Sequence, residues 1–198
     1  MKPGNAGIAF LERTVWLDGE RVYSRPRLQP LRFAPGTDLM AVVRFEADGG
    51  GLPAAARVIH EVMPALSIPG VRALQIDFDA RQSERAWYAA FLRDLHRAVP
   101  ARTALTITAL ESWCEEDTWI RDLPVADATP MLFRMGSDDR PAPATGFPAG
   151  VCGSSVGVST DELPVCVPPV QRVYFFHPGP WTKDAYEMAV AQANMWRR

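Results

Sequence analysis

Stretches of apolar residues recur along the chain at the lengths expected of strands. The first spans residues 6–17 and ends at the turn Asp18-Gly19, after which residues 21–28 are expected to return as the second arm of a hairpin. Further core strands are predicted at residues 39–47, 71–80, 104–110, 128–136, 154–160 and 172–178. The hydrophobic pattern therefore predicts about seven core strands.

Apolar residues at helical spacing predict helices between several of these strands. One helix is expected over residues 53–67, where Pro64 should kink or shorten it, and a clearer one over residues 83–99 with Ser83 as its N-cap. A short helix at 115–123 and a last one at 182–198 complete the pattern. Strands that alternate with helices favour parallel βα units, and we predict a single domain over residues 1–198.

A closed α/β barrel and an open doubly wound sheet both fit this alternation. In a barrel the polar residues that end the strands form one site. Five of the predicted strands carry polar residues at their C-terminal ends, namely Arg44 and Glu46, Asp77 and Asp79, Thr106 and Thr108, Arg134, and His177. Because an open sheet does not readily bring five strand ends to one site, we predict a (β/α) TIM-type barrel.

The composition is that of an ordinary globular protein and limits the partners. The net charge of −2 gives no reason to expect a nucleic acid or an anionic membrane as a partner. There is no run of 18 apolar residues, so no membrane span is expected, and the first residues lack the long apolar segment of a signal peptide. As written, the chain is expected to be cytoplasmic, and its oligomeric state is not predicted.

The cysteines and histidines predict neither a disulfide framework nor a metal site. Cys114, Cys152 and Cys166 are odd in number and contain no C-x-x-C pair. A Cys152–Cys166 disulfide is geometrically feasible, but buried or half-buried thiols are favoured. No two histidines have the spacing of metal ligands, and no cofactor is expected.

Asp77 and Asp79 are the candidate catalytic pair. Residues two apart on a strand face the same way, so the two carboxylates should point together from an otherwise apolar strand. Two acids on either side of a scissile bond are the usual machinery of glycoside hydrolysis. The alternative is a buried salt-bridge cluster in which Arg44, Arg81 or Arg134 neutralises the pair.

Other residues near the predicted strand ends have competing interpretations. Glu46 is either a third catalytic carboxylate or an ion-pair partner of Arg44, and Glu84 is better explained by stabilisation of the helix start. The aromatic rings of Trp113 and Trp181 follow strands and suit the apolar faces of sugars, although core packing explains each equally well. The candidates for substrate binding are Arg44, Gln75, Thr108, Trp113, Arg134, His177 and Trp181.

Residues 153–157 match the G-x-S-x-G motif of serine hydrolases, with Asp161 and His177 following in the appropriate order. That motif requires a helix directly after the serine. The proline-rich residues 158–169 cannot form one, so we do not expect a serine hydrolase.

Five segments in order carry a resemblance to a known family: "LQIDFDARQSER", "LTITALESWC", "ATPMLFRMG", "CGSSVGVSTDELP" and "RVYFFHPGPWT". Together they resemble bacterial domain-of-unknown-function family 3142, which is grouped with TIM-barrel glycosidase-like proteins. The resemblance extends from Gly7 to Trp181 and implies a (β/α) barrel with the carboxylate-bearing strand near the middle of the chain. It implies no particular activity.

Two departures qualify the resemblance. Family members begin with a further strand, so this chain is expected to be an incomplete barrel with its first strand absent. Chitinase-like enzymes carry D-x-D-x-E on the corresponding strand, and Arg81 stands where the glutamate would be. An arginine cannot act as a general acid.

We therefore expect a glycoside hydrolase-like protein that binds a small-molecule or oligosaccharide ligand. In it Asp79 is expected to be the proton donor or nucleophile, Asp77 to tune the pKa of Asp79 as a like-charge neighbour, and Glu46 to be a possible partner. The alternative is a non-catalytic glycan-binding or scaffold protein. An upstream signal would move either protein to the periplasm or cell surface.

Overall fold

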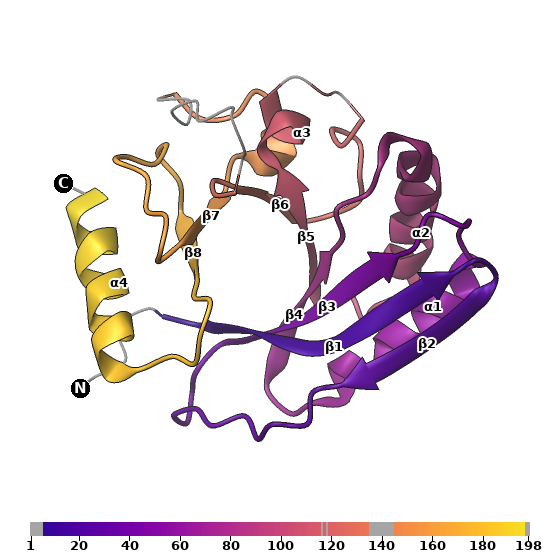
Figure 1. Ribbon diagram of the computed structural model, residues 1–198, viewed down its shortest axis with the longest axis horizontal. Coiled ribbons are helices and arrows are strands. Elements are labelled where there is room, and N and C mark those ends of the chain that lie inside the picture. Colours follow the sequence, from indigo (N-terminus) through magenta and orange to yellow (C-terminus); the bar gives the residue numbers. More distant parts are fainter. Residues whose placement is uncertain (1–5, 116, 118, 135–144, 197–198) are drawn as a thin grey trace. The chain divides into compact units, whose positions relative to one another are not determined.

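The computed structural model describes residues 6–115, 117, 119–134 and 145–196 (Figure 1). Contacts divide the chain into two compact units. Unit 1 contains the residues up to Thr108 together with residues 122–126. Unit 2 contains residues 109–121 and those from Asp127 onward. The single domain remains a prediction.

Unit 1 is built on a mixed sheet in the order β2-β1-β3-β4-β5. The predicted hairpin is confirmed, because β1 (Ile8–Asp18) pairs antiparallel with β2 (Arg21–Pro26) around Gly19, whose φ of +58° suits a glycine. The remaining strands, β3 (Leu39–Ala47), β4 (Val71–Asp77) and β5 (Ala104–Leu110), run parallel to β1. β5 ends with two residues that belong to unit 2.

Two helices pack against one face of this sheet. Figure 1 shows α1 (Ala55–Val62) and α2 (Arg85–Ala98) beside the strands of unit 1. As predicted, Pro64 ends the regular helix, and α1 continues as the 3₁₀ turn η1 (Met63–Ser67). Phe45 of β3 contacts both Phe78 and Phe91, with ring centroids 5.8 and 5.3 Å apart, so aromatic residues join the sheet to α2.

The opposite face of the same sheet carries polar side chains. Residues alternate along β3, so Val43 and Phe45 are buried while Arg44 and Glu46 are exposed. The parallel register places Arg44 beside Asp77 of β4. This alternation assigns the apolar residues to the helix-covered face and leaves the charged residues for the other face.

Unit 2 contains three parallel strands, β6 (Asp127–Met131), β7 (Ser155–Ser159) and β8 (Arg172–Phe176). Its helical segments are α3 (Glu111–Glu115), the 3₁₀ turn η3 (Gly150–Cys152) and α4 (Lys183–Trp196). The helix predicted at 115–123 is wrong, because α3 ends where it should begin and residues 119–122 form turns. Residues 116 and 118 of that prediction, and residues 135–136 of the predicted strand 128–136, lie outside the described part.

The cysteine prediction is also wrong. Cys114 of α3 and Cys152 of η3 form a disulfide with their Cα atoms 5.9 Å apart, whereas Cys166 is an exposed free thiol. The sequence did not indicate Cys114 as the partner of Cys152, because the contact that joins α3 to η3 depends on the tertiary structure. The disulfide ties together two short helical segments that have few backbone hydrogen bonds of their own.

The prediction of a (β/α) TIM-type barrel is wrong. Helices follow β3 and β4 as the barrel requires, but β1 leads directly into an antiparallel hairpin partner. In unit 2 the described residues between β7 and β8 contain no helix, and the described residues between β6 and β7 contain a 3₁₀ turn but no α-helix. The strand-helix alternation therefore holds for only part of the chain. The structure also contains no helix, among the residues described, that is long and apolar enough to cross a membrane.

Candidate functional site

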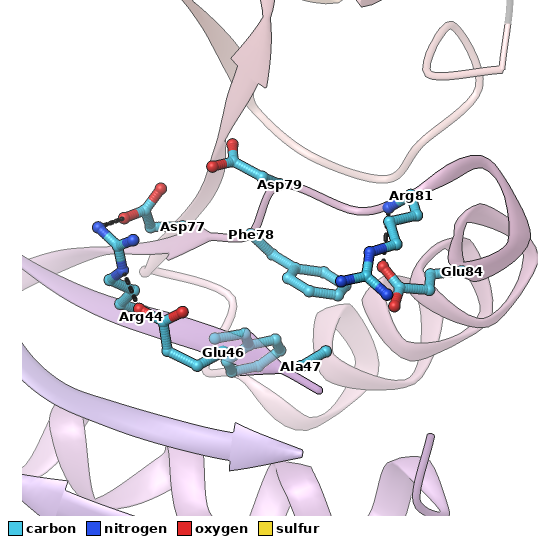
Figure 2. A pocket seen from close by; sticks show the side chains of 9 residues that line it. Arg44, Glu46, Ala47, Asp77, Phe78, Asp79, Arg81 and Glu84 are labelled. Atoms are coloured by element: carbon cyan, nitrogen blue, oxygen red, sulfur yellow. Dashed lines mark hydrogen bonds and ion pairs between the residues drawn. The ribbon is translucent and has the colours of Figure 1, made fainter. Parts of the chain in front are cut away.

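A pocket of about 110 Å³ lies at the C-terminal ends of β3 and β4 in unit 1. Its walls come from β3, β4, the segment after β4 and the start of the following helical turn (Figure 2). The lining residues are Arg44, Phe45, Glu46, Ala47, Asp77, Phe78, Asp79, Arg81 and Glu84. Three of these, Glu46, Asp77 and Asp79, are the predicted catalytic carboxylates.

Asp77 is the last residue of β4 and is held from both sides. Thr108 Oγ1 of the neighbouring strand β5 donates a hydrogen bond of 2.8 Å to Asp77 Oδ1. On the other side, Arg44 Nη1 lies 3.9 Å from Asp77 Oδ2, which is a loose ion pair rather than a bidentate one (Figure 2). The Asp77 side chain is 25% exposed, so solvent reaches it only in part.

The surroundings raise the pKa of Asp77 above its ordinary value. Burial is the largest cause, because it disfavours the charged carboxylate, and the negative charges of Asp79 and Glu46 add to the increase. The hydrogen bond from Thr108 and the charge of Arg44 act in the opposite direction without reversing it. Asp77 therefore holds its proton to higher pH than a free aspartate.

Glu46 forms an ion pair with Arg44, as one of the two interpretations of this residue predicted. Arg44 Nε donates to Glu46 Oε1 at 2.7 Å, and both side chains are about half exposed. Arg44 thus joins Glu46 to Asp77, because it contacts both carboxylates. A catalytic role for Glu46 remains a hypothesis.

Asp79 and Arg81 follow the end of β4 and differ in their surroundings. Asp79 is exposed, and Figure 2 shows its carboxylate directed away from the Arg81–Glu84 end of the pocket. The Arg81 guanidinium lies against the backbone of Gly49, a residue with a φ of +87°. The predicted salt-bridge cluster is only partly formed, because Arg44 pairs with Asp77 and Glu46, and within the described chain no arginine forms an ion pair with Asp79.

Glu84 has the structural role that its position predicted. Its carboxylate accepts a hydrogen bond of 2.7 Å from the backbone N–H of Arg81, at the start of the 3₁₀ turn η2 (Gln82–Glu84) that precedes α2. The prediction of Ser83 as the N-cap is wrong, because Ser83 lies inside η2. Only 6% of Glu84 is exposed, so this carboxylate is committed to the helix start.

Gln75 and Thr108 lie beneath the pocket rather than on its surface. Each is 2% exposed, and Gln75 pairs in register with Thr106 of β5. Thr108 donates a hydrogen bond to Asp77 and thereby supports the pocket from behind. Neither Thr108 nor Gln75 lines the pocket itself.

The four remaining predicted residues belong to unit 2. Trp113 is fully buried and packs edge-on to Trp119, with ring centroids 4.9 Å apart and planes at 74°. Its ring is therefore part of the core of unit 2 in this structure. Trp181 is different, because it is 48% exposed and lies 5.0 Å from the ring of His177.

At the strand ends of unit 2, His177 and Arg134 both lie close enough to Asp161 for their charges to act on it. His177 Nδ1 and Thr160 Oγ1 are 2.7 Å apart, and the backbone N–H of Arg134 donates to both carboxylate oxygens of Glu162 at 3.1 and 3.0 Å. A hydrogen bond from Ser159 lowers the pKa of Asp161, and the charges of Arg134 and His177 contribute. Arg134 has a φ of +56°, which is unusual for a residue other than glycine.

A buried carboxylate that the sequence analysis missed lies in unit 2. Asp127 opens β6 and is 3% exposed, and its Oδ2 accepts a 2.5 Å hydrogen bond from Ser155 Oγ. Ser155 Oγ is also 2.9 Å from Thr129 Oγ1. Burial raises the pKa of Asp127, although the Ser155 hydrogen bond opposes this increase. An acid directly before an apolar strand was the only available signal.

The same cluster accounts for the serine-hydrolase motif. Ser155 is fully buried at the start of strand β7, where it is hydrogen bonded to Asp127. As predicted, the described residues after Gly157 contain no helix until α4. Across the part of the chain that the structure describes, no group of three or more His, Cys, Asp and Glu side chains is placed to hold a metal ion.

Comparison with known proteins identifies a family. The family model described as Domain of unknown function (DUF3142) matches residues 36–138, a range that includes every residue of the pocket. Searches of curated proteins and of solved structures found no match. Because the family model covers more than half of the 198 residues, the chain belongs to this family.

Proposed function

We propose that this protein is a glycoside hydrolase-like enzyme whose reaction centre is the pocket at the ends of β3 and β4. The observation that carries the proposal is the raised pKa of Asp77 beside two other carboxylates, Glu46 and Asp79. A carboxyl group whose surroundings raise its pKa, close to further carboxylates, is the arrangement that glycoside hydrolysis needs. Bidentate ion pairs between arginines and these carboxylates would argue against a catalytic role. Arg44 is only loosely paired with Asp77, so this objection does not apply to Asp77.

We assign the proton-donor role to Asp77. Its proton would pass from the Asp77 carboxyl to the glycosidic oxygen as the bond to the anomeric carbon breaks. The exposed Asp79 would act on the anomeric carbon, either directly as a nucleophile or through an attacking water, with Glu46 as the alternative carboxylate. Arg44, which donates a hydrogen bond to Glu46, would position that carboxylate and bind substrate hydroxyl groups.

The pocket is too small to enclose a whole oligosaccharide. At about 110 Å³ it is well below the roughly 300–1,000 Å³ typical of sites that enclose a small ligand. Most of the substrate would therefore lie on the surface around the pocket. In unit 2 the exposed ring of Trp181, with His177 and Arg134, is a second place where sugar could bind.

A non-catalytic glycan-binding protein is the second candidate function. The observation that favours it is Arg81, which stands where a chitinase-like enzyme carries its acid and packs against Gly49 rather than into a hydrogen bond with Asp79. Such a protein would keep the polar pocket and the exposed aromatic ring but would not break a bond.

A glycan array followed by product analysis tests both functions. The proteins compared are the wild type, Asp77→Asn, Asp79→Asn and the control Asp94→Asn, which removes a carboxylate that pairs with Arg97 on the surface of α2. A glycan that is cleaved by the wild type and the control, but bound and left intact by Asp77→Asn, supports the hydrolase. Binding without cleavage by all four proteins supports the glycan-binding function, and no binding by folded protein contradicts both.

We also propose that the protein works in an oxidising compartment, such as the periplasm or cell surface. The Cys114–Cys152 disulfide supports this location, because disulfides form and persist mainly outside the reducing cytosol. The cytoplasmic location expected from the first residues of the chain is the competing hypothesis.

A further inference from the structure

The polar face of unit 1 continues beyond the pocket onto β1 and β2. The parallel register pairs Trp16 of β1 with Glu46 of β3, and the antiparallel register pairs Tyr23 of β2 with Trp16. Residues paired in register on adjacent strands point to the same side of a sheet. Trp16 and Tyr23 therefore share the face of Glu46, opposite the face that α1 and α2 cover.

The two aromatic rings stack face to face, and the Tyr23 ring is exposed. Trp16 and Tyr23 stack with their centroids 5.4 Å apart and their planes at 11°, and Tyr23 is 53% exposed. Large aromatic rings on a sheet are normally covered, but here one stacked ring presents its other side to solvent. Pyranose rings have apolar C–H faces that pack on such a surface. We call Trp16 and Tyr23 the stacking platform.

The spacing of the strands sets the distance from the platform to the reaction centre. Neighbouring strands lie about 4.8 Å apart, so Tyr23 is two strand spacings, or roughly 10 Å, from Glu46. This length accommodates a short run of linked sugar units. A chain that lies across the strands would contact Tyr23 at one end and reach the pocket with the other.

Arg25 gives the platform a positive charge. It lies on the same face as Tyr23 and pairs in register with Thr14, and its guanidinium is 5.5 Å from the centre of the Trp16 ring. Arg44 is already paired with Glu46, whereas no carboxylate within the described residues pairs with the exposed Arg25. A ligand that carries its own carboxylate would provide that partner.

We propose that the stacking platform and Arg25 form a subsite for acidic oligosaccharides, in which a uronic acid ring stacks on Tyr23 and its carboxylate pairs with Arg25. This inference rests on the proposed function for the identity of the reaction centre, but the subsite itself is a binding surface with its own residues. It identifies the substrate class as uronic acid-containing chains that enter across β2 and β1. Neutral chains would stack on the same rings without the ion pair.

Calorimetric titration with two probes tests the subsite. The probes are a galacturonic acid hexamer and the neutral cellohexaose, measured against the wild type, Tyr23→Ala, Arg25→Gln and the control Arg93→Gln on the exposed side of α2. We expect the wild type to bind the acidic hexamer more tightly. Tyr23→Ala should weaken its binding about threefold to tenfold, through lost stacking. Arg25→Gln should weaken only the acidic probe, about threefold to fivefold at low salt, and the control should match the wild type.

The outcomes separate the subsite from the proposed enzyme. Weaker binding of the acidic hexamer by Tyr23→Ala and Arg25→Gln, with no cleavage by any protein, would support the subsite and contradict the hydrolase. Cleavage by the wild type with unchanged affinity in both variants would contradict the subsite and leave the hydrolase intact. Equal binding of both hexamers, or binding of neither, would also overturn the subsite. Unchanged thermal unfolding of each variant shows that the fold is retained.

Discussion

At the scale of single residues, the pKa of Asp77 depends on several identified neighbours. Burial and the charges of Asp79 and Glu46 raise its pKa, while Thr108 and Arg44 lower it. Thr108→Val removes a hydrogen bond that favours the charged form, so we expect the pKa of Asp77 to rise further. Asp79→Asn removes a neighbouring negative charge, so the pKa should fall. Carboxyl ¹³C chemical shifts followed against pH measure both changes without a substrate.

The titration has a control and a contradictory outcome. Asp94→Asn on α2 should leave the Asp77 titration unchanged, since Asp94 is paired with Arg97. If Thr108→Val lowered the pKa of Asp77, or Asp79→Asn raised it, the assigned causes would be wrong. The proposed donor role would then lose its main support.

The raised pKa of Asp127 leads to a prediction of how the stability of the protein depends on pH. Its pKa is raised in the folded state, so the folded protein binds this proton more tightly than the unfolded chain does. The resulting stabilisation is present below the unfolded pKa and is lost as the pH rises through the folded pKa. Asp127→Asn removes the ionisation. We therefore expect the variant to gain in free energy of unfolding, relative to the wild type, as the pH is raised from 4 to 8.

Urea unfolding at pH 4 and at pH 8 measures this difference. Ser155→Ala is the matched variant, because it removes the hydroxyl that donates to Asp127 Oδ2. The ionised carboxylate needs that donor more than the neutral one, so Ser155→Ala should cost more at pH 8 than at pH 4. Parallel stability curves for Asp127→Asn and the wild type would contradict the raised pKa.

The sequence located the carboxylates of the pocket, but it favoured Asp79 as the proton donor or nucleophile, whereas the raised pKa is that of Asp77. Alternation along a strand predicts which way a side chain points, since that direction follows from local geometry. The pairing of Asp77 with Arg44 comes from the register of β3 and β4, which is a tertiary feature. Burial, which makes Asp77 differ from the exposed Asp79, depends on neighbours from other strands. For the same reason Trp113 could not be assigned to the core in advance, because its partner Trp119 and its burial are tertiary features.

At the scale of elements, the close approach of β6, β7 and β8 depends on Gly157. A Cβ atom added there would lie 2.7 Å from Met131 Sδ and 3.1 Å from Phe176 Cε2. We expect Gly157→Ala to lower the free energy of unfolding by about 1–3 kcal/mol through overpacking. Gly150→Ala is the control, because a Cβ there meets nothing within 4 Å, and its effect should stay within about 0.5 kcal/mol.

A double variant identifies the cause of the Gly157→Ala effect. Met131→Ala removes the flexible side chain that the new Cβ would approach most closely. If overpacking is the cause, Gly157→Ala should cost less in the Met131→Ala background than in the wild type, as measured by urea unfolding. An equal cost in both backgrounds would indicate a backbone effect instead.

Elements with a strong local pattern were predictable. The strands β3 and β5 match their predicted ranges, and α1, α2 and α4 differ from theirs only near the ends, because apolar periodicity and Pro64 act locally. The predicted helix at 115–123 failed because Trp119 and Ile120 pack in unit 2, where Ile120 is buried in a turn, while Leu123 is buried in unit 1. Tertiary packing there outweighs helix propensity.

At the scale of the whole chain, the barrel prediction failed because it assumed that the strand-helix alternation of residues 39–110 continues through all the other strands. The succession β3-α1-β4-α2-β5 follows the barrel pattern, but the connection from β7 to β8 has no helix to cover a barrel strand. Prolines such as Pro164, Pro168 and Pro169 in that connection oppose helix formation. These residues were visible in the sequence, and they outweigh the polar strand ends on which the barrel prediction rested.

The Cys114–Cys152 disulfide gives a prediction that concerns the chain as a whole. The bond closes a loop with a sequence separation of 38 residues, which corresponds to about 3–4 kcal/mol of stabilisation by restriction of the unfolded chain. The double variant Cys114→Ser/Cys152→Ser should lose this amount in urea unfolding. Cys166→Ser should lose almost nothing, because Cys166 is an exposed free thiol.

Thiol labelling then tests the proposed location. Protein isolated without reductant and unfolded in the presence of an alkylating reagent should gain one label, on Cys166, whereas prior reduction should give labels on all three cysteines. The same measurement on protein expressed in a reducing cytosol should give three labels from the start, together with the lower stability of the double variant. One label and full stability in both preparations would show that the bond forms regardless of compartment, and it would remove the support that the disulfide gives to an oxidising location.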